Sequence, residues 1–512
     1  MTTPYDRIPY PARMHPQAHP DRLATMGKLF GLSTPPLETC RVLELGCGEG
    51  GNLIPAAFSL LGARFLGIDL SSTAVAAAAT TARELNLTNI DVRAMDLREF
   101  PGDAGTFDYV IAHGVYSWVP ADVRERLLGI CREHLAPNGI AYVSYNTYPG
   151  HRLREIARDA MRFARDKGAS GLEDPVAAAR ATFRMIAEGA CGDAAYNAVV
   201  KDELARLMEI DERVLFHDDL AECSTPFYFS QFAADAARQG LQYLTDADYD
   251  ETADRPVRPG LAASLDRLAG GGGDVIVREQ YADFLVGRAF RRTLLCHASV
   301  KVDRPARPAS LVGLRVAANV SPVAADAGTA GRGVRRFKTG KGATLSTNHP
   351  AASAALELLG RVWPRSIPFT DLPRAAGVED TPTVRDDLGG FLLTAAAGGA
   401  VEFSLHAPPM AEEAGERPLA SRLARHQAAH GELVTTLTGR NVKLEGAWAR
   451  ELLLLLDGTR DRAALVACLA RQVRGGQLNL VGGCGADDLP RVLRERLEPK
   501  LAELARLGLL VG

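Results

Sequence analysis

The sequence lacks several features that would each indicate a particular class of protein. None of its eight cysteines forms a Cys-x-x-Cys pair, so we expect no metal site and no disulfide framework. The longest aliphatic runs, such as residues 452–456, are far shorter than the roughly 20 apolar residues of a membrane span. Residues 1–23 are rich in proline and histidine and contain no apolar stretch of the kind found in secretory signals. Together with free thiols, which suit a reducing compartment, these absences predict a cytoplasmic protein without membrane insertion.

The sequence also has no excess of charge of one sign. Lysine and arginine total 59 against 62 aspartates and glutamates, which gives a net charge of −3. This balance provides no general attraction for phosphate, so we do not expect a nucleic-acid partner. A local basic stretch at 335–341 is interpreted as a solvated hairpin rather than as a binding patch.

What the sequence does contain is an ordinary globular composition over a long chain. Its 512 residues are 46% hydrophobic, and at about 150 residues per domain they predict two to four domains. Between residues 41 and 146, short apolar runs alternate with stretches that are compatible with helices. This alternation predicts a parallel sheet covered by helices. The expected strands are 41–45, 64–68, 90–94, 107–112 and 139–145, and the expected helices are 51–61, 72–86 and 121–135.

The remaining segments have less regular patterns. Residues 1–40 predict an ordered arm followed by a helix, and residues 151–225 predict helices without a strand. A helix and two strands are expected within 226–300, where they would complete the sheet. Residues 310–407 and 430–512 predict two small α+β modules, in each of which helices followed by a strand resemble a winged helix.

The strongest motif is a glycine-rich turn after the first expected strand. That strand leads into Gly46-x-Gly48-x-Gly50, and Asn52 follows as a helix begins. Glycines at such a turn allow positive φ angles and let a ligand approach the backbone. A dinucleotide would place its pyrophosphate here, but Glu44 at the end of the strand would repel that anion. Glu44 instead suits a cationic group, such as the amino group of a methionine moiety.

Acidic residues also follow the second and third expected strands. Asp69 lies about 20 residues after Gly50, where a carboxylate can accept hydrogen bonds from both ribose hydroxyls. Leu70 follows it directly. Asp96 and Leu97 come after the third strand, where the carboxylate can accept from an adenine amino group.

These motifs resemble the ordered motif set of class I S-adenosylmethionine (SAM)-dependent methyltransferases. The resemblance implies SAM as the cofactor, with Gly46 and Gly48 next to its methionine part, Asp69 at the ribose and Asp96 at the adenine. The motifs that carry it are Glu44-x-Gly46-x-Gly48-x-Gly50, Asp69, Asp96, Phe107-Asp108 and Pro137-x-Gly139. The residues expected to contact the cofactor are Glu44, Gly46, Gly48, Gly50, Asn52, Asp69, Leu70, Asp96, Leu97 and His113.

A narrower resemblance concerns a bacterial group that carries a methyltransferase regulatory domain and a C-terminal winged-helix-like region. It is similar to bacterial lysine methyltransferases that act on outer-membrane proteins, and it implies methylation of a protein lysine. The implied fold is an α/β Rossmann-like sheet with a helical insertion over 151–225 and a regulatory-domain-like region over 226–300. The methyltransferase domain would then span 1–300, ahead of the two winged-helix-like modules. The resemblance rests on Tyr5-Asp6, Pro9-Tyr10-Pro11, His19–Leu23, His113–Pro120 and Ser144–Gly150.

Candidates for the methyl-acceptor site follow two neighbouring strands. His113, Tyr116 and Trp118 come after the fourth expected strand, and Tyr145 and Asn146 come at the end of the fifth. Ligands bind at the carboxyl edge of a parallel sheet, and aromatic faces attract a methyl cation. These five residues are the predicted catalytic set, although the aromatic ones would also suit packing of the insertion on the sheet.

Further residues and other functions stay open at this level. His15 in the arm is a candidate for closing over the cofactor, or else for a purely structural arm, and Asp218 for orienting a lysine ammonium or capping a helix. A protein substrate is expected. Methylation of a small molecule is the first alternative, and a SAM-sensing regulator that binds a partner or DNA through its C-terminal modules is the second. The sequence sets neither the acceptor nor the oligomeric state.

Overall fold

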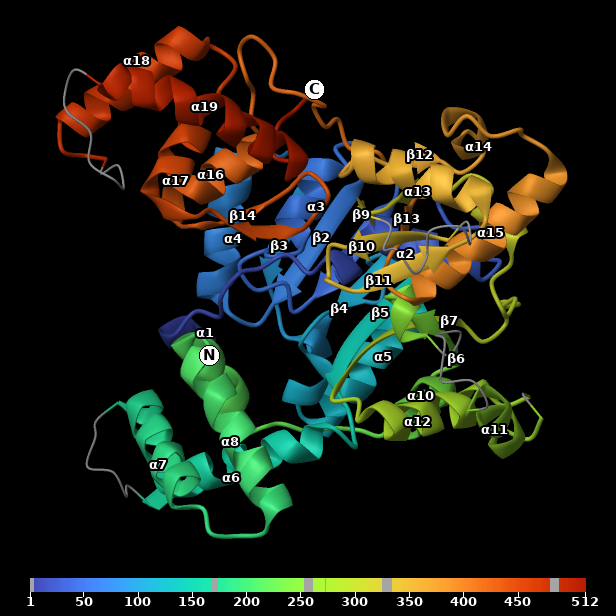
Figure 1. The fold of residues 1–512 in the computed structure, drawn as a ribbon. Coiled ribbons are helices and arrows are strands. Elements are labelled where there is room, and N and C mark those ends of the chain that lie inside the picture. The colour runs from blue at the N-terminus through green and yellow to red at the C-terminus, as the bar shows by residue number, and fades with distance from the viewer. Residues whose placement is uncertain (1–3, 168–173, 253–260, 272, 325–333, 479–487) are drawn as a thin grey trace.

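The computed structural model describes residues 4–167, 174–252, 261–271, 273–324, 334–478 and 488–512. Its centre is a seven-stranded sheet with the strand order β3-β2-β1-β4-β5-β7-β6 (Figure 1). The first five strands are parallel, whereas β7 lies antiparallel to both β5 and β6. The strands are β1 (Arg41–Leu45), β2 (Arg64–Asp69), β3 (Ile90–Ala94), β4 (Phe107–Ala112), β5 (Leu135–Asn146), β6 (Leu241–Asp246) and β7 (Phe290–His297).

The central strands form where the sequence has uninterrupted apolar runs, because both faces of a parallel sheet are covered. In β1, Val42, Leu43 and Leu45 are fully buried, and the strand pairs with β2 on one side and β4 on the other. The predicted Rossmann-like sheet is confirmed. Residues 226–300 complete it through β6 and the antiparallel β7, as expected.

Helices cover the two faces of the sheet with separate apolar cores. On one face, α2, α3 and α4 pack over side chains that include Tyr142 of β5. On the other face, α5 and α10 pack over side chains that include Tyr145 of the same strand. The bounds of these helices are α2 (Pro20–Leu29), α3 (Leu53–Ser59), α4 (Ser72–Glu84), α5 (Ala121–His134) and α10 (Phe229–Arg238).

The expected helical insertion lies between β5 and α10, at the bottom of Figure 1. It has an apolar core of its own, in which Met161, Phe183 and Leu207 are fully buried. Its elements are α6 (His151–Lys167), α7 (Pro175–Gly189), α8 (Ala194–Glu209), α9 (Glu212–Val214) and η4 (Leu215–Asp219).

Two helices between β6 and β7 are not predicted by the sequence pattern. They are α11 (Leu261–Leu268) and α12 (Val275–Val286), and α12 packs beside α10. The short η5 (Tyr249–Glu251) follows β6. The region 226–300 therefore completes the sheet and also adds a small helical layer at its β6 edge.

The middle module follows the helix order expected for it. Its basic stretch forms the β10–β11 hairpin, in which Arg335 forms an ion pair with Glu357. The elements are η6 (Pro308–Leu311), β8 (Arg315–Ala317), β9 (Val320–Val323), β10 (Arg335–Thr339), β11 (Thr344–Thr347), α13 (Pro350–Val362), β12 (Ile367–Pro368), α14 (Leu372–Ala375), α15 (Pro382–Ala397) and β13 (Glu402–Ser404).

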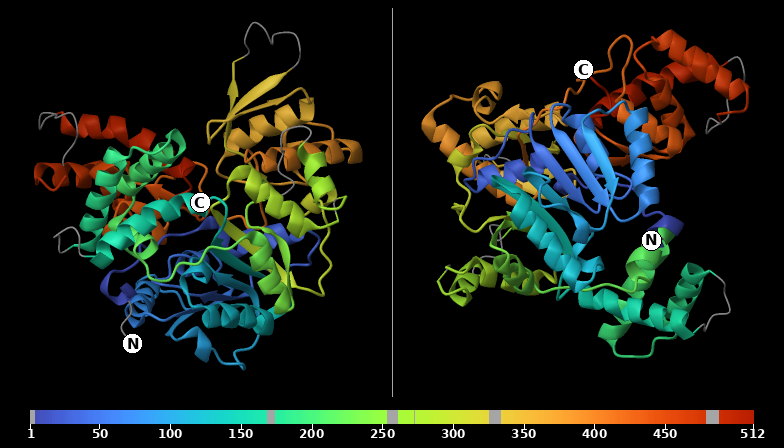
Figure 2. Two further views of the ribbon diagram at one scale, coloured as in Figure 1. Left: turned by 90° about the horizontal axis from the view of Figure 1, so that it is seen from below. Right: turned by 180° about the vertical axis from the view of Figure 1, so that it is seen from behind.

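The C-terminal module begins earlier than the expected residue 430. Ala424 and Ala428 of α16 are buried in the same core as Leu452 and Leu493, so α16 belongs to this module. The right-hand view of Figure 2 shows the module, in red, apart from the insertion, in teal and green. Its elements are α16 (Arg422–His430), β14 (Leu433–Thr435), β15 (Asn441–Lys443), α17 (Gly446–Leu455), α18 (Arg462–Arg474) and α19 (Leu489–Arg506).

Short elements complete the fold. The arm contains α1 and η1 ahead of α2, and η2 and η3 follow β3 and β4. Within the described ranges, no helix is both long and apolar enough to cross a membrane. The bounds are α1 (Pro4–Arg7), η1 (Pro16–Ala18), η2 (Leu97–Glu99) and η3 (Tyr116–Trp118).

Candidate functional site

The glycine turn after β1 has the backbone conformation that its sequence predicts. The φ angles are 75° at Gly46, 52° at Gly48 and 81° at Gly50, a region that side chains other than glycine rarely adopt. A Cβ atom on Gly46 would lie 2.4 Å from a methyl group of Val115 after β4. At Gly48 the same added atom would meet nothing within 4 Å. The turn is therefore packed on one side and open on the other.

Glu44 lies under this turn and is 1% exposed. Its Oε1 accepts a 2.8 Å hydrogen bond from Nδ2 of Asn52, while its Oε2 has no partner in the described part of the chain. Burial raises the pKa of the Glu44 carboxyl to about 8. A buried acid with one unsatisfied oxygen is suited to a cationic partner, which is what an ammonium group of a ligand would supply.

Asp69 ends β2 beside the turn. Its Oδ2 accepts from the backbone N of Gly48 at 2.8 Å, and its Oδ1 accepts from the backbone N of Ser71 at 2.9 Å. Each carboxylate oxygen has a second lone pair, so both can still accept from a pair of hydroxyls. Burial raises the pKa of Asp69. Leu70, the next residue, is half exposed at the same edge.

Asp96 and Leu97 follow β3, next to the end of β2 along the sheet. Asp96 accepts from the backbone N of Arg98 at 2.9 Å and forms an ion pair with its guanidinium at the same distance. Leu97 is buried behind it. Apart from His113, which follows β4, the predicted cofactor contacts thus lie at the carboxyl ends of three neighbouring strands, β1, β2 and β3.

The N-terminal arm crosses this site. The backbone N of His15 donates a 2.8 Å hydrogen bond to Oδ1 of Asn52, the same side chain that supports Glu44. At its start, Asp6 accepts a 2.6 Å hydrogen bond from the Ser71 hydroxyl. The arm therefore runs from the end of β2 to the end of β1, and its backbone at Arg13 packs against Gly51.

Two histidines stack where the arm meets β4. The rings of His15 and His113 are 3.8 Å apart, and Nδ1 of His113 shares a 2.8 Å hydrogen bond with the hydroxyl of Tyr142. Burial lowers the pKa of His15 to about 4 and that of His113 well below its usual range, and the cation of Arg292 lowers both further. Both imidazoles are therefore neutral near pH 7. His15, Tyr142 and Arg292 are absent from the predicted catalytic set.

The prediction that Tyr116 and Tyr145 belong to the catalytic set needs correction. Both are 1% exposed, and both lie in the core under α10, with Tyr145 stacked on Phe232 at 4.1 Å. The Tyr116 hydroxyl donates to Asp235 at 2.9 Å, and the Tyr145 hydroxyl shares a 3.0 Å hydrogen bond with Thr293. Each phenol is thus fully used inside the core, on the face of the sheet away from His113 and Tyr142.

Asn146 and Trp118 lie differently. Asn146 ends β5 and is 5% exposed, and its side-chain Nδ2 has no partner among the described residues. Its backbone N donates to the hydroxyl of Ser117 at 2.9 Å, which ties β5 to η3. Trp118 ends η3 and is partly exposed. Both residues, like His113, stay candidates for contact with the acceptor.

We expect the substitution Tyr145→Phe to lower stability and to leave turnover intact. It removes one buried hydroxyl and leaves Thr293 without its partner, which costs about 1 to 3 kcal/mol. Thermal melting and steady-state kinetics on the same preparation measure both effects. Tyr148→Phe removes a hydroxyl whose partner, Glu155, is more exposed, and it serves as the matched control. A Tyr145→Phe protein with normal melting but no turnover would return this phenol to the catalytic set.

The insertion contacts the arm from the other side. Tyr5 stacks on the ring of His217 at 4.2 Å, and Nε2 of His217 donates a 2.6 Å hydrogen bond to the carbonyl of Ile8. Asp218 forms a 3.4 Å ion pair with Arg154, and burial raises the pKa of its carboxyl to about 6. Asp218 is therefore partly neutralised within the insertion rather than simply capping an exposed helix.

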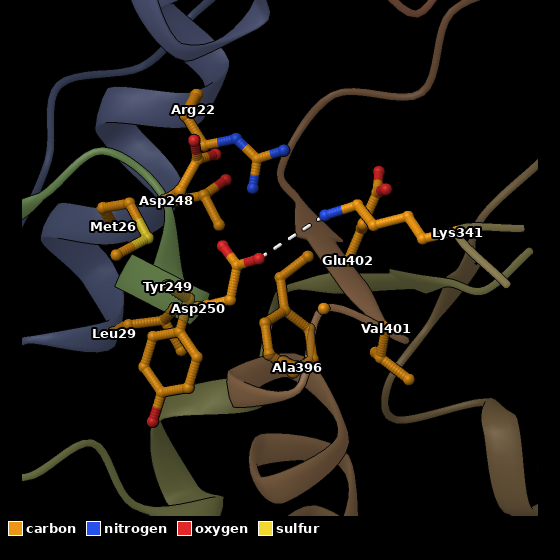
Figure 3. A pocket seen from close by; sticks show the side chains of 13 residues that line it. Arg22, Met26, Leu29, Asp248, Tyr249, Asp250, Lys341, Ala396, Val401 and Glu402 are labelled. Carbon is orange, nitrogen blue, oxygen red and sulfur yellow. Dashed lines mark hydrogen bonds and ion pairs between the residues drawn. The ribbon is translucent and has the colours of Figure 1, made fainter. Parts of the chain in front are cut away.

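A separate pocket lies between α2, η5 and the middle module (Figure 3). Its lining includes Arg22, Asp248 and Glu402, and a 3.4 Å ion pair joins Asp250 to Lys341 across it. It contains none of the predicted site residues. The charges that line it are mixed in sign, and two of its acids pair with arginines: Asp248 with Arg292, and Glu402 with Arg440.

Models of known families match three stretches of the chain. They are described as a methyltransferase domain over residues 42–139, a predicted methyltransferase regulatory domain over 211–297, and a PKMT C-terminal winged helix domain over 416–509. The last match begins before α16, in agreement with the core of that module. Two curated proteins of Rickettsia prowazekii (strain Madrid E), both uncharacterized, are similar to the chain. One is 29% identical over 488 residues, 93% of this chain and 87% of that protein, and the other is 32% identical over 241 residues, 47% of this chain and 96% of that protein.

Solved structures with the same architecture include PKMT2 from Rickettsia typhi. The chain superposes on it with a TM-score of 0.87 at 26% identity, covering 98% of this chain and 100% of that chain. The structure of PKMT2 in complex with AdoHcy gives a TM-score of 0.87 at 27% identity, with the same coverage. The likeness therefore includes the sheet, the insertion and both C-terminal modules.

Proposed function

We propose that this chain, which belongs to the SAM-dependent methyltransferases that carry a methyltransferase regulatory domain, methylates lysine side chains of a protein substrate. The observation that supports a protein lysine as the acceptor is the likeness to PKMT2. It extends along the whole chain, beyond the cofactor-binding sheet that many methyltransferases have in common. PKMT denotes a protein lysine methyltransferase. The lysine-methyltransferase motifs around the arm, β4 and β5 support the same acceptor.

The residues at the carboxyl ends of β1 to β3 fit SAM. Glu44 offers its unsatisfied Oε2 to the amino group, and Asp69 offers two lone pairs to the ribose hydroxyls. The open side of Gly48 admits the ligand to the backbone. Asp96, which the resemblance assigns to the adenine, and the half-exposed Leu70 follow β3 and β2 at the same edge of the sheet. Bound there, SAM would supply an electrophilic sulfonium methyl group to a neutral amine, with S-adenosylhomocysteine as the leaving group.

The residues near β4 and β5 suit an amine acceptor. A lysine must be neutral to act as a nucleophile. His113 and His15 are neutral near pH 7 and present ring nitrogens and aromatic faces without a charge. The unpartnered Nδ2 of Asn146 can orient a carbonyl of the acceptor chain.

Mass spectrometry after incubation with SAM labelled in its methyl group tests this function. The acceptors are an unfolded bacterial outer-membrane protein, a lysine-free variant of that protein, and a mixture of small metabolites. Labelled lysine peptides from the first acceptor alone support the proposal. Label in the metabolites, or tight SAM binding without any transfer, contradicts it and favours a small-molecule enzyme or a SAM-sensing regulator.

We expect binding of S-adenosylhomocysteine at pH 7 to release close to one proton. With a pKa of about 8, Glu44 is mostly protonated in the free enzyme at pH 7. An ammonium beside Oε2 stabilises the charged form, lowers that pKa and expels the proton. Affinity should therefore rise between pH 6 and pH 8. Calorimetry in buffers with different ionisation enthalpies counts the released protons.

The matched control for proton release is Glu44→Gln. The amide keeps the shape of the side chain and can still pair with Asn52, but it has no titrating proton. We expect this variant to bind more weakly and to release no proton at pH 7. Equal proton release by the two proteins would show that the proton comes from another group and would remove Glu44 from the cofactor site.

A further inference from the structure

Helix α12 is oriented opposite to an ordinary surface helix. Its inward side carries two acids, Glu279 and Asp283, which are 1% and 0% exposed. Its outward side carries a large apolar face, the α12 apolar face, although surface helices normally turn such residues toward the core. This face consists of Tyr281, Phe284, Leu285 and Val286, which are 36% to 50% exposed.

A buried ion cluster fixes this orientation. The guanidinium of Arg291 on β7 is fully buried and pairs with Glu279 at 2.9 Å, Asp283 at 2.8 Å and Asp246 at 2.7 Å. Rotating α12 to bury its apolar face would break two of these pairs and leave charges without partners, at a high cost. The apolar face is therefore held toward solvent by the chain itself, as expected of a surface that another molecule covers.

A row of aromatic rings continues the α12 apolar face toward the catalytic edge of the sheet. The ring of Tyr281 lies 6.4 Å from that of Phe284, which lies 5.8 Å from Tyr228, which lies 5.3 Å from Tyr148. Tyr148 comes two residues after Asn146, the last residue of β5. The row thus leads from the surface of α12 to the strand end where the acceptor must arrive.

The backbone joins the two ends of this row directly. The backbone N of Thr147 donates to the carbonyl of Ala289 at 2.9 Å, and that of Gly150 donates to the carbonyl of Arg288 at 2.9 Å. A Cβ atom on Gly150 would lie 2.1 Å from the carbonyl oxygen of Gly287, at the end of α12. The two backbones therefore touch at that contact, with no side chain between them, and α12 and the end of β5 form one continuous surface.

We propose that the α12 apolar face and the rings of Tyr228 and Tyr148 dock the acceptor protein as an extended, unfolded segment with alternating apolar side chains. This inference rests on the proposed function, whose substrate it specifies. Neighbouring rings in the row are between 5.3 and 6.4 Å apart. Side chains on one face of an extended chain repeat about every 6.6 Å, a similar spacing. A folded acceptor would keep such apolar side chains in its own core, so the row selects segments that are not yet folded.

Continuity with the catalytic edge favours this occupant over a second copy of the chain. A partner that covered α12 alone would not contact the rings of Tyr228 and Tyr148. A polypeptide that lies along the whole row brings its lysine toward His113 and Asn146. Arg152 stacks on Tyr148 at 3.9 Å and pairs with Glu155, which ends the apolar row with charged groups. We therefore expect the docked segment to have apolar residues before its lysine and polar residues next to the lysine itself.

Fluorescence anisotropy with two synthetic peptides tests the docking. One labelled ten-residue peptide has a lysine preceded by alternating leucine and serine, and the other has serine in place of each leucine. We expect the first to bind at least tenfold more tightly, and Phe284→Ser or Tyr281→Ser to abolish that difference. Phe284→Leu should retain it. Binding is read without methyl transfer, so the result does not depend on turnover.

Leu61→Ser is the matched control, because Leu61 is 70% exposed and lies outside the row. It should leave peptide affinity unchanged, and all the variants should melt as the wild type does. With a protein acceptor, Phe284→Ser should raise KM while kcat and the affinity for S-adenosylhomocysteine stay the same.

Three outcomes would overturn the docking. The first is equal affinity for the two peptides. If the enzyme still methylated protein lysines, the proposed function would stand and the docking would be contradicted. Equal weakening by Leu61→Ser and Phe284→Ser would show a nonspecific apolar effect. A wild-type dimer in light scattering that becomes monomeric in Phe284→Ser would assign the α12 apolar face to a second copy of the chain.

Discussion

Replacing Arg291 with alanine is expected to lower the free energy of unfolding by about 3 to 5 kcal/mol. Its guanidinium is fully buried and pairs with Asp246, Glu279 and Asp283. Its removal leaves three buried acids, of which Asp283 still pairs with Arg288. Removing one member of a buried ion cluster costs more than the cluster contributes, because the remaining charges have already lost their water. Urea unfolding followed by circular dichroism measures the loss.

The loss in Arg291→Ala should depend on pH. Burial raises the pKa values of Glu279 and Asp283, and the arginine cation counteracts this. Without the cation these folded-state pKa values rise further above the unfolded ones. A group with a raised folded pKa stabilises the protein below its unfolded pKa and loses that contribution as pH rises through the folded value. The loss of unfolding free energy in the variant, relative to the wild type, should therefore be smallest near pH 5 and largest near pH 8.

Arg238→Ala provides the comparison for this prediction. Arg238 pairs with Asp235 at the surface, with a side chain that is 71% exposed, so its loss should change stability by less than about 1 kcal/mol. If Arg291→Ala unfolded at the same urea concentration as Arg238→Ala, the buried cluster would not hold α12 in place. The orientation of the α12 apolar face would then need another cause.

The absence of α12 from the sequence-based predictions has the same physical origin. Sequence patterns locate a helix by the apolar stripe that faces the core. In α12 the apolar residues do not form one stripe on the core side: Tyr281, Phe284 and Leu285 are exposed. The core side is made of Glu279 and Asp283, which pair with Arg291 on a strand that follows in the sequence. Acidic residues normally indicate the exposed side of a helix, but in α12 they are buried. The arginine that pairs with them lies outside the helix, so the helix sequence alone does not show this.

The central sheet was predictable because its signals are local. Continuous apolar runs such as Val42–Leu45 mark strands buried on both faces, and the glycines that follow them must adopt positive φ angles wherever a strand turns into a helix this tightly. Glu44 and Asp69 were placed at strand ends by the same argument. Strand ends in a parallel sheet lie at one edge, so their carboxylates meet there without further information.

The acceptor side was less predictable because it depends on which face each residue takes. Tyr145 and Asn146 are adjacent in β5, so their side chains point to opposite faces of the sheet. Both come from the same strand end in the sequence. Tyr145 packs in the core under α10, whereas the side-chain Nδ2 of Asn146 has no partner among the described residues. His15 shows a second limit. Its stacking partner His113 is far away in the sequence, and only the path of the arm brings the two rings together.

Asp69→Ala is expected to weaken SAM binding about a hundredfold or more. The substitution removes a pair of hydrogen bonds from ribose hydroxyls to a charged acceptor, each worth about 1.5 to 3 kcal/mol, and every 1.4 kcal/mol is about tenfold in affinity. It also deprives the backbone N–H groups of Gly48 and Ser71 of their acceptors, which loosens the turn. Isothermal titration with SAM measures the affinity directly.

Two variants separate the ribose contacts from the loosened turn. Asp69→Asn keeps one carbonyl oxygen and the size of the side chain, so it should hold the turn better than alanine yet still lose the charge that strengthens the hydroxyl contacts. Asp91→Ala, on the exposed surface of β3 where the acid pairs with Arg93, should bind SAM normally. If Asp69→Asn bound SAM as the wild type does while Asp69→Ala did not, the acid would act through the turn alone. Unchanged affinity in both Asp69 variants would place the ribose elsewhere, and the carboxyl end of β2 would no longer be part of the cofactor site.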